Sequence, residues 1–162
     1  MPPTALGEVT NYSAGSTKSI CLLPPTTAPN GPPTDAGAGL EVAAISALWQ
    51  GRLSVELGLL LYSTAGSGVM TAKGRLWSYH PGPADWFPLG TGADGTKGVV
   101  NATNQIGETS ADKIRHQETL ALPGLVGTRI YFEITEALGG TGTSVTVELV
   151  ARDGYPALGG TR

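Results

Sequence analysis

The sequence offers one thiol and two imidazoles as candidate catalytic groups. Cys21 lies in the apolar run SICLL, with Lys18 as the nearest cation, and His80 and His116 lie far from it along the chain. A nucleophilic cysteine needs a neighbouring base or a positive field to stabilise its thiolate. The pattern therefore favours a buried structural cysteine and two ordinary strand histidines over a nucleophile and base pair.

Carboxylates are the second set of candidate catalytic groups. Glu133, Glu136 and Glu148 fall on neighbouring predicted strands near the C-terminus. Glycoside hydrolysis needs two carboxylates facing each other across a cleft at about 5 to 10 Å. The alternation of apolar residues predicts that Glu133 and Glu148 point to solvent, so the sequence predicts no catalytic residue and no enzyme.

Metal and phosphate sites lack their characteristic spacings. Asp85, Asp94, Glu108 and Asp112 cluster loosely without the ordered spacing of a calcium loop, and the histidines have no zinc-ligand spacing. The glycines of residues 139–142 join two predicted strands and do not open a helix, as a phosphate cradle would. We therefore expect no metal site and no cofactor.

Four aromatic residues lie close together in the window GRLWSYHPGPADWFPLG: Trp77, Tyr79, Trp86 and Phe87. They suit a stacking platform for sugar rings, a small core beneath a Pro-rich segment, or an anchor at an interface. The second and third interpretations are favoured, because no set of Asn, Asp and Gln accompanies the aromatics to bind sugar hydroxyls.

The composition indicates a protein with an unusually neutral surface. Charged residues make up 14% of the 162 residues, compared with about 25% in ordinary soluble domains, while Gly (24) and Pro (12) are abundant. The net charge of −3 argues against nucleic acid as a partner, and the longest apolar run, Leu57–Tyr62, is far below the roughly 20 residues of a membrane span. Residues 1–20 lack the pattern of a secretory leader, so we expect a soluble protein made inside the cell.

Residues 1–39 are predicted to be an extended N-terminal arm and linker, with a strand at 17–23 as one option. The segment PPTTAPNGPPTDAGAG favours extended, polyproline-like backbone. We expect the arm to reach a neighbouring subunit, so that its deletion leaves the remaining domain folded. The candidate interaction residues are Pro24, Pro25, Pro29, Pro32, Pro33, Trp77, Tyr79, Trp86 and Phe87.

Residues 40–162 are predicted to form an all-β domain, an antiparallel β-sandwich of jelly-roll or Greek-key type. Apolar residues alternate from Leu53 to Tyr62, and shorter strands are expected at 73–80, 86–89, 98–102 and 114–122, with turns of Gly and Pro between them. Residues 40–49 fit a strand or a helix, and the Gln-Gly pair that follows them favours the strand.

The last two predicted strands, around Ile130–Ile134 and Val145–Leu149, suggest a hairpin. Two registers keep their apolar residues on one face, and one of them sets Glu133 opposite Glu148. Like charges directly opposite each other are unfavourable. The predicted register therefore pairs Phe132 with Val147 and Tyr131 with Glu148.

With its Pro- and Thr-rich arm, its Gly-rich predicted sandwich and the runs WSYHPGPADWFPLG (77–90) and KGVVNATNQIGET (97–109), the chain resembles tailed-bacteriophage head decoration, or capsid cement, proteins. The resemblance covers the layout of the whole chain. It implies a virion protein made in the host cytoplasm that binds the major capsid protein lattice on the capsid exterior, often as a homotrimer, without catalysis. Other phage neck or tail components and a carbohydrate-binding module are the alternatives.

Overall fold

The computed structural model describes residues 3–11, 17–46, 55–64, 68–88, 99–106, 115–120, 127–136 and 144–153. These residues are mostly β-strand, and α1 (Val42–Ser46) is their one helix. All the strand pairs in this part of the chain are antiparallel. The predicted all-β class is therefore confirmed.

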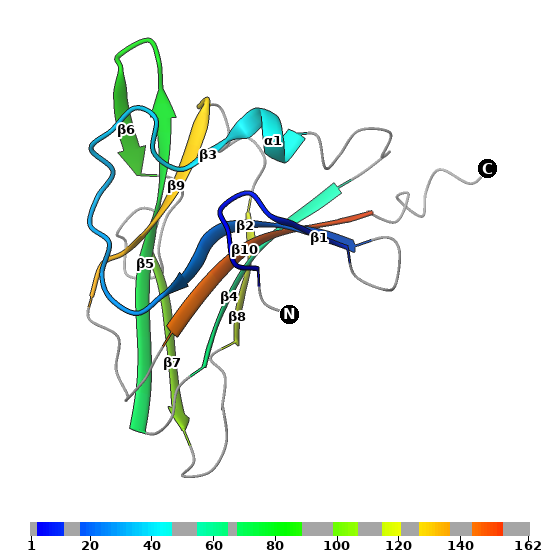
Figure 1. Cartoon of the computed structure of the whole chain (residues 1–162), viewed down its shortest axis with the longest axis vertical. Helices are drawn as coiled ribbons and strands as arrows, with labels where there is room; N and C mark the ends of the chain where they lie inside the picture. Colours follow the sequence, from blue (N-terminus) through cyan, green and yellow to red (C-terminus); the bar gives the residue numbers. More distant parts are fainter. Residues whose placement is uncertain are drawn as a thin grey trace, which may run out of the picture.

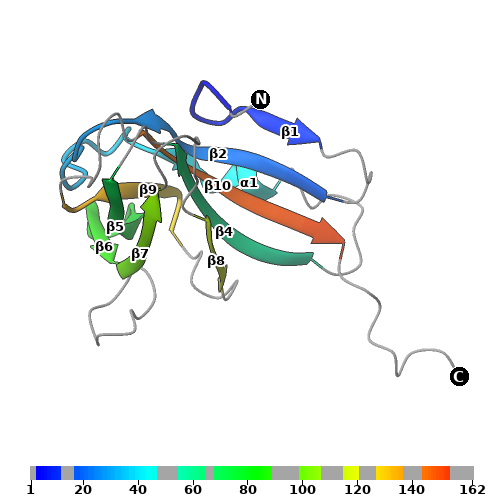
Figure 2. The ribbon, with the colours of Figure 1, turned by 90° about the horizontal axis from the view of Figure 1, so that it is seen from below.

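The strands form two antiparallel sheets (Figure 1). Sheet A has the order β1 (Val9–Asn11), β2 (Thr17–Thr26), β10 (Ser144–Asp153), β4 (Val55–Thr64) and β8 (Arg115–Leu120). Sheet B has the order β3 (Leu40–Glu41), β9 (Arg129–Ile134), β5 (Gly68–His80) and β6 (Asp85–Pro88), with β7 (Val99–Ile106) also paired to β5. Figure 2 shows β2, β10 and β4 side by side, with β5, β6, β7 and β9 of sheet B gathered at one end of them.

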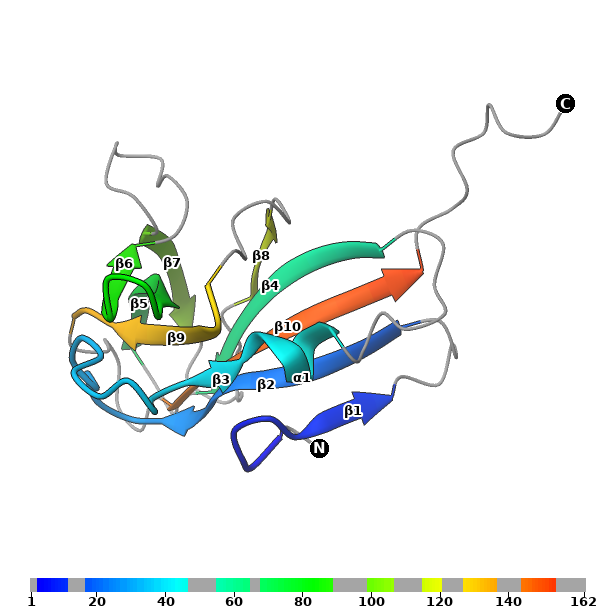
Figure 3. The same cartoon turned by 90° about the horizontal axis from the view of Figure 1, so that it is seen from above.

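The strands expected from two-residue periodicity are present, because alternation is a local property of each segment. β4, β5, β6, β7 and β8 cover the predicted strands as far as the described residues extend. Residues 40–49 are part strand and part helix: β3 takes only two residues before α1 begins, and 47–49 lie outside the described residues. Figure 3 shows β3 and α1 lying over β2 and β10.

The predicted C-terminal hairpin is wrong, because β9 and β10 belong to different sheets. Phe132 lies opposite Leu76 of β5, whereas Val147 lies opposite Leu61 of β4 and Leu23 of β2. All ten residues of β10 pair with β4, which gives a longer ladder than the six residues of β9 allow. The connection after β9 therefore crosses from sheet B to sheet A.

Each sheet contributes a row of fully buried apolar side chains. These residues, each at most 2% exposed, are Leu76, Ile130, Phe132 and Ile134 in sheet B and Ile20, Val145, Val147 and Leu149 in sheet A. β2 and β9 are in contact across the two sheets. The ring of Phe132 occupies the space beside Gly74, where a Cβ atom would collide with its Cζ and Cε1 atoms. Residue 74 of β5 must therefore be glycine for the Phe132 ring to pack there.

Residues 17–26 form an internal strand of sheet A, at the place where the sequence offered a strand at 17–23 as one option. β2 pairs with β1 on one side and β10 on the other, and all five residues from Ser19 to Leu23 are buried. Register shifts against β10 fall beside Pro24 and Pro25, and bulges are where a strand tolerates residues without an N–H group. The domain boundary at residue 39 stays a prediction.

Replacing Phe132 by alanine should reduce the free energy of unfolding by about 3–5 kcal/mol, because it empties a site that is 1% exposed. The chain's other phenylalanine, Phe87, is 44% exposed and provides a matched control. Phe87→Ala should change stability by less than about 1 kcal/mol. Urea unfolding of both variants measures the difference, and equal losses would contradict the assignment of Phe132 to the core.

Deleting residues 1–39 should abolish cooperative unfolding, which reverses the expectation drawn from the sequence. The deletion removes β1 and β2, and it uncovers the edge of β10 that carries Val147 and Leu149. Thermal melts followed by circular dichroism provide the measurement. A truncated protein that melts cooperatively near the temperature of the full chain would show that β2 is dispensable.

Candidate functional site

The outer face of sheet B carries three of the nine predicted interaction residues, Trp77, Tyr79 and Trp86. Leu76 and Ser78 of β5 are buried, while Arg75, Trp77 and Tyr79 alternate with them and are half-buried. Residues directly opposite in an antiparallel pair share a face. The cross-strand partners of this row are therefore on the same outer face; they are Arg129, Tyr131 and Glu133 on β9 and Trp86 and Pro88 on β6.

Residues 27–39, which we call the strap, join β2 to β3 and are bound to the free edge of β9. The side chain of Asn30 makes the two hydrogen bonds that the main chain of a neighbouring strand would make. Its Nδ2 donates to the carbonyl of Phe132 (3.0 Å), and its Oδ1 accepts from the N–H of Ile134 (2.7 Å). One amide therefore satisfies a carbonyl and an N–H group that an edge strand would leave unpaired.

Two aromatic side chains of the outer face donate hydrogen bonds to the main chain of the strap. The indole Nε1 of Trp86 donates to the carbonyl of Asp35 (3.2 Å), and the hydroxyl of Tyr131 donates to that of Gly31 (3.2 Å). Trp86 is 8% exposed, and its ring lies 5.3 Å from Tyr79 and 6.1 Å from Tyr131 between centroids. Trp86 thus belongs to a small core beneath the Pro-rich segment, one of the interpretations drawn from the sequence.

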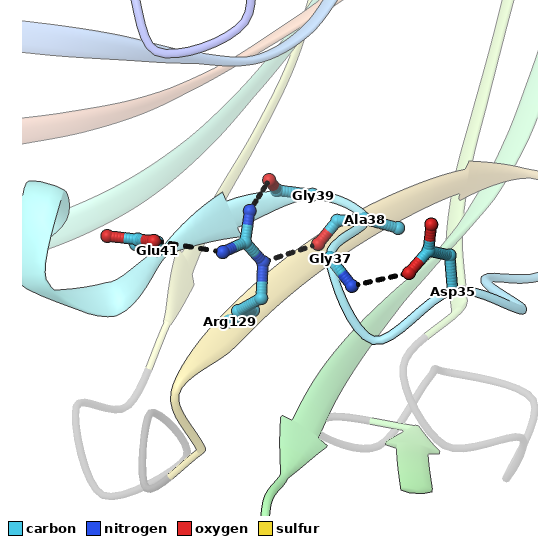
Figure 4. A network of polar contacts seen from close by, with 6 residues as sticks. All are labelled: Asp35, Gly37, Ala38, Gly39, Glu41 and Arg129. Atoms are coloured by element: carbon cyan, nitrogen blue, oxygen red, sulfur yellow. Dashed lines mark hydrogen bonds and ion pairs between the residues drawn. The ribbon is translucent and has the colours of Figure 1, made fainter.

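Arg129 fixes the end of the strap (Figure 4). Its Nε donates to the carbonyl of Ala38 (2.8 Å), one terminal nitrogen donates to the carbonyl of Gly39 (2.9 Å), and the other pairs with Glu41 (3.0 Å). Gly39 has a φ of +70°, and a Cβ atom there would collide with the carbonyl oxygen of Ile130. The strap can approach β9 so closely only because residue 39 is glycine.

Glu133 is buried on this face, which overturns the expectation that it points to solvent. It is 8% exposed and accepts a hydrogen bond from Nε1 of Trp77 (2.7 Å). The guanidinium of Arg75 lies 5.6 Å from the centre of the Trp77 ring, a cation–π contact. Burial and the charge of Glu133 raise the pKa of Tyr131.

The four predicted aromatics do not form one platform. Phe87 lies opposite Ser78, on the other face of sheet B from Trp77, and its ring lies 5.4 Å from the His80 ring between centroids, with the two planes nearly perpendicular. Trp86 is covered by the strap, which leaves Trp77 and Tyr79 as the half-buried aromatics of β5 on the outer face. Of the predicted prolines, Pro25, Pro29 and Pro32 are exposed, and Pro24 and Pro33 are half-buried.

Sheet A contains a second group of chemically capable residues: Ser19, Cys21 and Glu148, which are 0%, 0% and 2% exposed. The Ser19 hydroxyl donates to Oε1 of Glu148 (2.5 Å), and Cys21 lies directly opposite Glu148 in the ladder. Burial, followed by the charges of Glu148 and Glu8, raises the pKa of Cys21 to about 12. The thiol is therefore protonated at neutral pH, as the prediction of a structural cysteine requires, and Glu148 is a further correction to the expected solvent-facing carboxylates.

Within the described parts of the chain, no three side chains among His, Cys, Asp and Glu are arranged to hold a metal ion. Asp94, Glu108 and Asp112 of the loose acidic cluster lie outside these parts. The backbone of β8 pairs His116 with Leu61. Over the same described residues, no helix has the length and apolarity to cross a membrane.

Comparison of the chain with protein-family models, curated proteins and solved structures finds no match.

Several residues that build the outer face had no distinctive signal in the sequence. Asn30, Arg129 and Tyr131 act through main-chain groups of segments about 90 to 100 residues away. Glu148 alternates with valine and leucine as a solvent-facing residue would. The Asn30-Gly31 pair is typical of a turn, but nothing in the sequence indicates that Asn30 bonds β9.

The Cys21 thiol should resist alkylation in the native protein and react in urea. Its native pKa of about 12 exceeds the unfolded value of about 8.5. Between these two pH values the unfolded chain has lost the thiol proton that the native state keeps. The contribution of this thiol to the free energy of unfolding is therefore fully present below about pH 8.5 and decreases as the pH rises above it. Urea unfolding at about pH 7 and about pH 9.5 measures this effect in the unmodified protein and in Cys21→Ala. The free energy of unfolding should fall less between the two pH values in the variant, which has no thiol. Rapid alkylation of the native thiol would contradict the assignment.

Proposed function

We propose that this protein is a structural component of a bacteriophage virion that binds the outer surface of the capsid and stabilises the shell without catalysis. The proposal rests on the resemblance of its arm, its Gly-rich layout and its aromatic window to head decoration proteins. The proposed partner is the major capsid protein lattice, the proposed assembled form is a homotrimer, and the proposed location is the capsid exterior.

The observation that best supports a binding role is the exposed apolar edge of sheet A. Leu6 and Val9 are each 45% exposed, and β1, to which Val9 belongs, ends sheet A in the described part of the chain. An edge strand offers unpaired N–H and C=O groups to a strand of another protein. The carboxylate of Glu8 is turned back to accept from the N–H groups of Thr4 (2.7 Å) and Ala5 (3.2 Å), which lower its pKa.

We also propose that the two sheets pack as an antiparallel β-sandwich of jelly-roll or Greek-key type. The chain passes repeatedly from one sheet to the other, from β2 to β3 and from β9 to β10 for example. Both sheets contribute fully buried apolar rows. These two features are typical of sandwiches with Greek-key connections.

The absence of catalysis is part of the proposal, and two contacts support it. Glu133 and Glu148 lie in different sheets, and each accepts a hydrogen bond from a neutral donor of the fold, Trp77 or Ser19. The thiol of Cys21 is buried and protonated. The two carboxylates are therefore held by hydrogen bonds within the fold, and the thiol is buried, which supports a structural role for all three groups.

A carbohydrate-binding module is the competing function, and cosedimentation distinguishes the two. The protein is mixed with expanded capsids stripped of accessory proteins, from the phage that encodes it, and separately with bacterial surface polysaccharide. We expect saturable binding to capsids alone and, by light scattering, a trimer. Binding to polysaccharide alone would replace the proposal with the competing one.

The double variant Leu6→Ser, Val9→Thr should bind capsids at least about tenfold more weakly than the unmodified protein, because two exposed apolar contacts are lost. Ala43→Ser is the control, since Ala43 is an exposed apolar residue of α1 and belongs neither to β1 nor to the predicted interaction residues. Equal capsid affinity for the double variant would show that the β1 edge is not the contact.

A further inference from the structure

The contact between the strap and β9 depends on a chemically labile residue. Asn30 precedes Gly31 in the one Asn-Gly pair of the sequence. Its amide holds the strap through both of its polar atoms, with Nδ2 on the carbonyl of Phe132 and Oδ1 on the N–H of Ile134. No other side chain of the described residues bonds these two main-chain groups of β9.

An Asn-Gly pair can convert itself without any enzyme or cofactor. The main-chain nitrogen of Gly31 attacks Cγ of Asn30, and a C–N bond forms as the side-chain nitrogen leaves as ammonia with the proton of the attacking N–H. Water then opens the cyclic imide at one of its two carbonyls, which gives aspartate or isoaspartate. Glycine favours the attack because it has no side chain to obstruct it.

We propose that Asn30 is a deamidation site that acts as a one-way latch for the strap. While the strap is docked, β9 holds both ends of the amide, so its Cγ cannot turn toward the nitrogen of Gly31. When the strap opens, the side chain is released and the reaction proceeds. The docked state therefore protects the residue that maintains it.

The aspartate product restores only half of the contact, because its carboxylate can still accept from the N–H of Ile134 but cannot donate to the carbonyl of Phe132. An aspartate at this position has no N–H group to donate to Phe132, and its negative charge faces that carbonyl oxygen, which stands 3.0 Å from Nδ2 in the docked state. An isoaspartate also lengthens the main chain by one carbon. Deamidation therefore weakens the contact of the strap with β9 and the cover over Trp86 and Tyr131, whose donors bond strap carbonyls.

Peptide mapping by mass spectrometry tests the protection. The native protein and a synthetic peptide of residues 27–38 are incubated in mildly alkaline buffer, and deamidation at Asn30 is followed over time. We expect a rate at least about tenfold lower in the native protein, because reaction requires a local opening. Urea below the unfolding midpoint should raise that rate. Equal rates in peptide and native protein would overturn the proposal.

The consequence is tested with Asn30→Asp, and Asn11→Asp is the matched control. Asn11 is an exposed residue of β1, so its replacement makes the same charge change away from the strap. We expect Asn30→Asp to speed hydrogen exchange at the Ile134 amide at least about tenfold and Asn11→Asp to leave it unchanged. If Asn30→Asp does not fold, deamidated protein separated by ion exchange supplies the same readout. Exchange at Ile134 as slow as in the unmodified protein would overturn the latch.

Discussion

The free edge of β9 sets the constraint on which the arrangement of sheet B depends. One edge of this buried strand pairs with β5, and the other must find partners for its N–H and C=O groups, since unpaired buried groups are costly. Two residues of β3 pair with its first part, and Asn30 serves Phe132 and Ile134. A single polar side chain thereby takes the place of an additional strand.

The other contacts of the strap follow from that docking. Once Asn30 holds the strap against β9, the carbonyls of Gly31 and Asp35 come within reach of Tyr131 and Trp86. Arg129 then bonds the carbonyls of Ala38 and Gly39, where β3 begins. Prolines in the strap lack N–H groups and restrict the backbone, which lowers the entropy lost on ordering. The Pro-rich segment is therefore bound within its own chain.

Two glutamates of this chain, which has few charged residues, are buried and held by neutral hydrogen-bond donors. Glu133 and Glu148 each lie in a sheet where neutral donors, the indole of Trp77 and the hydroxyl of Ser19, reach their carboxylates. A buried carboxylate is tolerated when its oxygens are hydrogen-bonded. Because the two glutamates are in different sheets, the like-charge repulsion that guided the hairpin prediction never arises.

The sequence by itself determined the all-β class, the positions of strands such as β4, β5 and β6, the alternation that puts Trp77 and Tyr79 on one face, and the structural character of Cys21. These are local properties, set by side-chain period, turn residues and the absence of a neighbouring base. Only the tertiary structure decided that β9 and β10 enter different sheets, that β2 is internal, and that Asn30, Arg129 and Glu133 matter. Those outcomes depend on which distant main-chain groups remain unpaired once the sheets form, and no local pattern records that.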